Sequence, residues 1–89
     1  MSVTGLSPDD WEWRGIEDGR DWLVSVQLRD GEVYVESGPA DPAARAHESV
    51  GGIQSFQSFL ESPAGWVSDY PVLAAFVEKV VRSRVASKA

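Results

Sequence analysis

Two Asp-Gly dipeptides, Asp18-Gly19 and Asp30-Gly31, constrain the fold more than any other feature of this sequence. Asp-Gly is typical of the two-residue type I′ turn that joins adjacent antiparallel strands. Polar and apolar residues alternate on both sides of each dipeptide, and a register shift of one residue would mix the two faces. The sequence therefore predicts a three-stranded antiparallel meander with strands at residues 11–16, 21–28 and 32–37.

Both turns direct the large apolar residues to the same face of the predicted sheet. The second turn places Val26 opposite Val35, and the first turn places Trp11 opposite Val26. Other members of this face are Trp13, Trp22, Val24 and Val33. The opposite face carries mostly polar residues. A sheet with one apolar face requires a second layer to cover it.

The remainder of the chain supplies that layer. Apolar residues at helical spacing predict a helix at residues 51–62, beginning with a Gly-Gly pair, and a C-terminal helix at residues 69–87. Residues 38–50 are rich in Ala, Pro and Gly and are interpreted as a loop, in which Asp41-Pro42 also fits the start of one helical turn. Residues 1–10 are an N-terminal segment, although Ser-Pro-Asp-Asp near its end also fits a short helix at residues 8–13.

These elements predict a single small α+β domain covering residues 1–89. In it, the β-meander at residues 11–37 is followed by two amphipathic helices packed on one face of the sheet. Trp66 lies in the connection between the helices and is expected to close one end of the core.

Composition excludes several functional classes. The net charge is −6, and residues 78–89 carry +3, so the other residues carry −9 and no nucleic-acid partner is expected. The basic end of the chain fits either a helix C-terminus or a docking element for an acidic partner or a membrane surface. No residue is cysteine, and no stretch is long and apolar enough to span a membrane, so we expect a cytoplasmic protein.

The sequence offers no catalytic or metal-binding constellation. His47 is the only histidine, and its neighbours Glu48 and Ser49 do not converge as members of a catalytic triad do. We therefore expect a protein without enzymatic activity and without a cofactor.

The aromatic residues provide the candidate binding surface. Three tryptophans on one sheet face are either core residues or, where the helices leave them uncovered, an exposed aromatic patch. The candidate residues are Trp11, Trp13, Trp22, Tyr34, Arg14, Gln27 and Trp66.

The leading hypothesis is a non-enzymatic protein-binding module. It would act as an adaptor, an inhibitor or an immunity-type protein, and self-association through an aromatic or apolar face is one form of it. An alternative is a small-ligand or carbohydrate binder with Trp and Tyr rings as stacking platforms. A weaker alternative is a regulator whose negative charge mimics nucleic acid.

Overall fold

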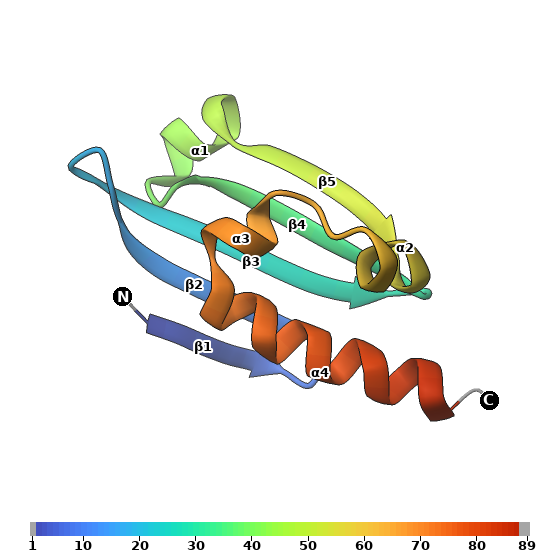
Figure 1. Ribbon diagram of the computed structural model, residues 1–89. Coiled ribbons are helices and arrows are strands. Elements are labelled where there is room, and N and C mark those ends of the chain that lie inside the picture. Colours follow the sequence, from blue (N-terminus) through green and yellow to red (C-terminus); the bar gives the residue numbers. More distant parts are fainter. Residues whose placement is uncertain (1, 88–89) are drawn as a thin grey trace.

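A computed structural model describes residues 2–87 and shows an α+β fold with one five-stranded antiparallel sheet, in the order β1-β2-β3-β4-β5 (Figure 1). Lys88, part of the predicted basic end, lies outside the described residues. The strands are β1 (Ser2–Ser7), β2 (Asp10–Glu17), β3 (Arg20–Arg29), β4 (Glu32–Pro39) and β5 (Val50–Ser55). The helices are α1 (Pro42–Glu48), α2 (Phe56–Glu61), α3 (Trp66–Asp69) and α4 (Pro71–Ser87).

The two predicted turns and their register are confirmed. Both residues of each turn have positive φ angles, 52° and 76° in the first and 50° and 76° in the second, as type I′ turns require. Trp11 lies opposite Val26, and Val26 lies opposite Val35. The local chemistry of the turns therefore determines the central three strands.

Two further strands flank the predicted meander, so the prediction of three strands is incomplete. The N-terminal segment contains β1, which pairs with β2 and places Val3 opposite Trp13. The alternative short helix at residues 8–13 is wrong, because the chain turns after Ser7 and is extended again from Asp10. The pairing of β1 with β2 satisfies backbone N–H and C=O groups that a single helical turn would have left without partners.

The predicted helix at residues 51–62 is also wrong over its first half. Val50–Ser55 forms β5 and pairs with β4, and the helix α2 begins only at Phe56. Two consecutive glycines are poor helix formers. Ser55 caps α2 by accepting a hydrogen bond from the backbone N–H of Ser58 at 3.1 Å.

The other two boundaries also differ from prediction. The predicted loop at residues 38–50 contains α1, where the side chain of Asp41 caps the helix by accepting a hydrogen bond from the N–H of Ala44 at 3.1 Å. The predicted helix at residues 69–87 corresponds to α4, and the short helix α3 precedes it in the predicted connection. Pro71 begins α4, and Tyr70 between the two helices packs its ring against Trp13 with centroids 4.6 Å apart.

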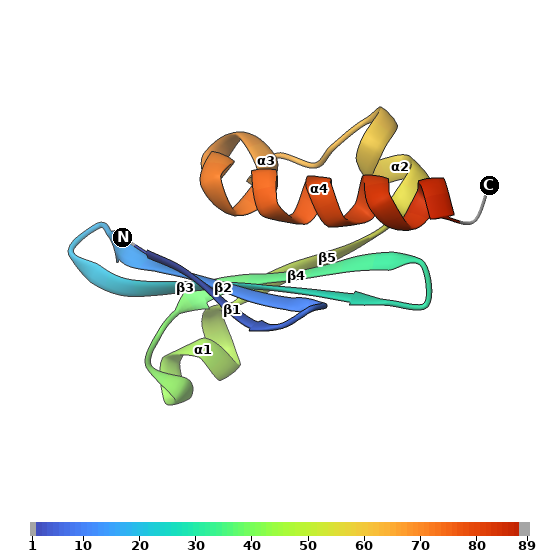
Figure 2. The ribbon, with the colours of Figure 1, turned by 90° about the horizontal axis from the view of Figure 1, so that it is seen from below.

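The helices lie on both faces of the sheet. Figure 2 shows α2, α3 and α4 on one face, here called the inner face, and α1 on the other, the outer face. The prediction that the helices share one face therefore holds for all but α1. The core lies under α4, where these residues are buried: Trp11, Trp13, Val24, Val26, Leu28, Val33, Phe56, Phe59, Tyr70, Leu73, Val77 and Val81.

None of the helices within residues 2–87 combines the length and the apolar character that crossing a membrane requires.

Candidate functional site

The strand β5 forms one edge of the sheet and carries no charged residue. Its sequence, Val-Gly-Gly-Ile-Gln-Ser, also lacks proline, and most of its residues are exposed. Proteins usually protect such edges with charges, proline or a covering element, because an open edge pairs with other chains. The opposite edge, β1, is also uncharged, but β5 differs from it by having an apolar cavity beside it.

The phase of the β4–β5 ladder shows which backbone groups of β5 are open. In an antiparallel pair, alternate residues direct both N–H and C=O toward the partner strand. The N–H of Phe56 donates to the carbonyl of Gly31 at 2.9 Å, so Gly52, four residues earlier, also bonds to β4. Gly51 and Ile53 therefore direct their N–H and C=O groups away from the sheet, where no strand of the described part of the chain meets them.

An apolar cavity of about 300 Å³ lies on the inner face beside this edge. Its floor is formed by β4 and β5, and its lining also includes Ala64 and Trp66. Ala64 belongs to the connection between α2 and α3, which crosses above the sheet (Figure 1), and Trp66 begins α3. The lining residues are Val33, Val35, Ser37, Val50, Gly51, Gly52, Ile53, Gln54, Ala64 and Trp66. The cavity can hold an apolar side chain or a small apolar molecule.

The side chain of Gln54 holds the connection in place above the sheet. Its amide nitrogen donates to the carbonyl of Ser62 at 3.0 Å, and its amide oxygen accepts from the N–H of Ala64 at 3.2 Å. Trp66 is further fixed by Phe59, with ring centroids 5.7 Å apart. The cavity wall is therefore tied both to β5 and to the core.

The surroundings of the two glycines of β5 differ, and only one of the two positions requires glycine. A Cβ atom at Gly51 would lie 2.8 Å from the carbonyl oxygen of Val35, so the close approach of β4 requires glycine there. A Cβ atom at Gly52 would meet nothing within 4 Å. No steric contact of the fold requires glycine at position 52, and its absent side chain leaves the floor of the cavity open.

The outer face of β5 has a second, polar hollow of about 660 Å³. Its lining residues are Ser25, Gln27, Tyr34, Val35, Glu36, Gly51, Gly52 and Ile53. The hydroxyl of Tyr34 donates to Oε1 of Glu32 at 3.3 Å, and the negative charge of Glu32 raises the pKa of Tyr34. The hollow is lined by one carboxylate and by no basic side chain.

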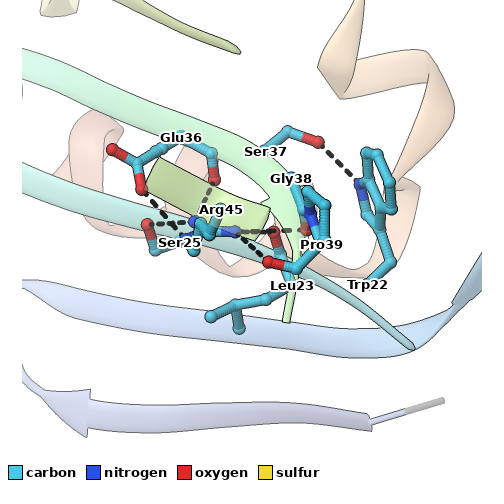
Figure 3. A network of polar contacts seen from close by, with 8 residues as sticks. All are labelled: Trp22, Leu23, Ser25, Glu36, Ser37, Gly38, Pro39 and Arg45. Atoms are coloured by element: carbon cyan, nitrogen blue, oxygen red, sulfur yellow. Dashed lines mark hydrogen bonds and ion pairs between the residues drawn. The ribbon is translucent and has the colours of Figure 1, made fainter. Parts of the chain in front are cut away.

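Arg45 of α1 lies beside Glu36, outside the lining of the hollow, and was not predicted from the sequence (Figure 3). Its guanidinium donates to the backbone carbonyls of Leu23 at 2.8 Å, Glu36 at 3.1 Å and Gly38 at 3.2 Å. Its Nε also pairs with Oε1 of Glu36 at 3.0 Å. These contacts join α1 to β3 and β4, next to the start of β5. Arginine at this position in a helix gave no recognisable signal in the sequence, because its acceptors are distant backbone atoms.

The predicted site residues are divided among three environments. Trp11 and Trp13 belong to the core, with 8% and 7% of their surface exposed. Trp22 is half-buried and donates its ring N–H to the hydroxyl of Ser37 at 2.9 Å (Figure 3). Arg14 is exposed on the outer face of β2 and pairs with Glu12 at 3.3 Å.

Three other predicted residues lie beside β5. Trp66 lines the inner cavity, whereas Gln27 and Tyr34 line the outer hollow. Sequence reasoning missed Gly51, Gly52 and Ile53 of the edge itself. The signal that could have identified them is an uncharged run with two glycines and β-branched residues, which is unusual for an exposed helix start.

The hollows beside β5 are an apolar cavity on the inner face and a polar one on the outer face. Among residues 2–87, the His, Asp and Glu side chains form no cluster of three that could hold a metal ion. His47 is exposed on α1. Comparison of the chain with protein-family models, with curated proteins and with solved structures found no significant match.

Proposed function

We propose that this protein is a non-enzymatic protein-binding module that accepts an extended segment of a partner protein as an additional strand along β5. The observation that carries the proposal is the uncharged edge of β5, where Gly51 and Ile53 direct backbone N–H and C=O groups outward beside an apolar cavity. An adaptor, inhibitor or immunity-type role would use this interaction to occupy a segment of the partner.

The energetic basis is that of strand addition. Backbone hydrogen bonds to the edge provide affinity that depends little on sequence, and pockets for alternate side chains provide specificity. The edge of β5 offers open backbone groups, and the cavity and the hollow provide pockets on opposite faces of the same glycine pair. The exposed Ile53, with 58% of its surface accessible, would be covered by the added strand.

The net charge of −6 supports a partner segment with positive charge. Complementary charge accelerates encounter and suppresses pairing with acidic partners. It also opposes the approach of a second acidic copy at low ionic strength.

Two exposed residues provide a matched test of the proposal. Leu6 of β1 and Ile53 of β5 are aliphatic residues with the same exposed fraction, 58%. Lysine on an edge strand opposes strand addition. We expect Ile53→Lys to abolish partner binding and Leu6→Lys to preserve it.

The measurement is affinity capture from the native host with the wild-type protein and both variants, followed by amide hydrogen exchange of the complex. Binding along β5 should protect the amides of Gly51 and Ile53. A strictly monomeric protein with no captured partner would contradict the proposal, as would a partner retained equally by both variants.

A small-ligand binder is the second candidate function, favoured by the Trp66 wall of the inner cavity. Its volume of about 300 Å³ suits one small apolar molecule or a sugar ring stacked on the indole. A screen monitored by tryptophan fluorescence tests this candidate. A ligand that changes the emission of the wild type but not of Trp66→Phe would support it, and rings that no aqueous quencher reaches would exclude it.

A further inference from the structure

We infer that the partner segment carries a large apolar side chain beside Gly52 and a lysine or arginine at the adjacent position. This inference rests on the proposed function, because it specifies which extended segment the β5 edge accepts. It follows from the different chemistry of the two faces at Gly51 and Gly52.

The alternation of an added strand places consecutive side chains on opposite faces of the sheet. The residue opposite Gly52 therefore faces the inner cavity, and its neighbour opposite Gly51 faces the outer hollow. Gly52 leaves space on the inner face that a side chain at that position would occupy, whereas Gly51 reflects the close approach of β4. Two consecutive side chains of the partner segment therefore contact two different surfaces of this protein.

The inner cavity selects a large apolar side chain. Its apolar walls are formed by the side chains of Val33, Val35, Val50 and Trp66. At Gly52 the floor is open, because a Cβ atom added there would have no neighbour within 4 Å. A small side chain would leave this space without contacts, and a charged side chain would lose its hydration there.

The outer hollow selects a positive charge. Glu36 lines it, and the side chain of Glu36 remains 54% exposed although one of its oxygens pairs with Arg45. The hydroxyl of Tyr34 and the amide of Gln27 provide further acceptors at the same place. Glu32 lies beside Tyr34, where its negative charge outweighs the positive charge of Arg29. An acidic side chain in this position would meet like charge.

A second copy of the chain fits this site less well than such a segment. Symmetric pairing through β5 supplies only residues of Val-Gly-Gly-Ile-Gln-Ser, which contains no cation for the outer hollow. It also brings two chains with a net charge of −6 together. The charge of the hollow therefore favours a basic segment from another protein.

The test uses three synthetic extended peptides of the form acetyl-Thr-Val-Thr-X-Z-Val-Thr-amide. The pair X-Z is Leu-Lys in the first, Ala-Lys in the second and Leu-Glu in the third. Binding to the full-length protein is measured from the amide NMR shifts of residues 51–53. We expect the Leu-Lys peptide to bind at least about tenfold more tightly than either of the others.

Variants of the protein test each face separately. Gly52→Val, which fills the cavity floor, should weaken the Leu-Lys peptide at least about tenfold, and Glu36→Gln should reduce the preference for Lys over Glu. Gly5→Val on the β1 edge is the control and should leave the affinity unchanged. A Cβ there meets only the Trp11 ring, in ordinary contact at 3.9 Å.

The possible failures separate this inference from the proposed function. Equal binding of all three peptides at residues 51–53 would overturn the inference and leave strand addition intact. If no peptide shifts these amides at about 1 mM while light scattering shows a dimer that Ile53→Lys dissociates, the occupant is a second copy and the inference is wrong. If no peptide shifts these amides, no such dimer forms, and the capture experiment finds no partner dependent on β5, both proposals are overturned.

Discussion

Replacement of Arg45 by methionine should lower the free energy of unfolding by about 2–4 kcal/mol. Methionine retains the apolar stem of the side chain but removes every hydrogen bond of the guanidinium, and the Arg45 side chain is only 13% exposed. The variant isolates the contribution of this group to the attachment of α1, because the helix itself buries none of its residues completely.

The magnitude follows from the separate contacts of Arg45. One guanidinium nitrogen donates to the carbonyls of Leu23 and Gly38, and the other donates to the carbonyl of Glu36. The part-buried carbonyls of Leu23 and Gly38 share one nitrogen and are counted once, at about 1.5–3 kcal/mol for a bond from a charged donor, whereas the exposed bond to the carbonyl of Glu36 adds only about 0.5 kcal/mol. The ion pair with Glu36 adds less than about 1 kcal/mol, because that carboxylate is half exposed to water.

Urea denaturation monitored by tryptophan fluorescence measures this difference, and Arg82→Met is the matched control. Arg82 is 61% exposed and pairs with Glu78 at 2.8 Å within α4, so its replacement should cost no more than about 0.5 kcal/mol. A loss for Arg45→Met that equals the loss for the control would refute the reasoning, since the contacts with the backbone carbonyls would then contribute nothing.

Three further predictions concern the edge and the core. Gly52→Val should leave the melting temperature unchanged or raise it, because no atom lies within 4 Å of the added Cβ and valine favours strands. Gly51→Ala should lower it, since the added Cβ would lie 2.8 Å from the carbonyl oxygen of Val35. Burial, together with a hydrogen bond to Glu17, raises the pKa of Tyr70. The folded state therefore binds this proton more tightly than the unfolded state, and stability should fall as the pH rises above about 10. Denaturation across this range should show a smaller fall for Tyr70→Phe, and an identical fall in both proteins would contradict the assignment.

The sequence alone determined the central meander and its register. Each Asp-Gly turn depends on neighbouring residues only, and the alternation on either side leaves one register that places Trp11 and Val26 on the apolar face. The amphipathic character of α4 was readable for the same reason, since its apolar positions recur within a few turns. The candidate residues Gln27, Tyr34 and Trp66 were identified as polar-face or connecting residues without a view of what surrounds them.

The tertiary structure decided the edges of the sheet and therefore the candidate site. Residues 50–55 have no strong local preference, and only the open hydrogen-bonding side of β4 makes them a strand. The same long-range pairing brings Trp66 over the glycine pair and positions Arg45 against backbone carbonyls of β3 and β4. Turns are encoded by adjacent residues, whereas an edge strand and its cavities depend on contacts between segments that are distant in the chain.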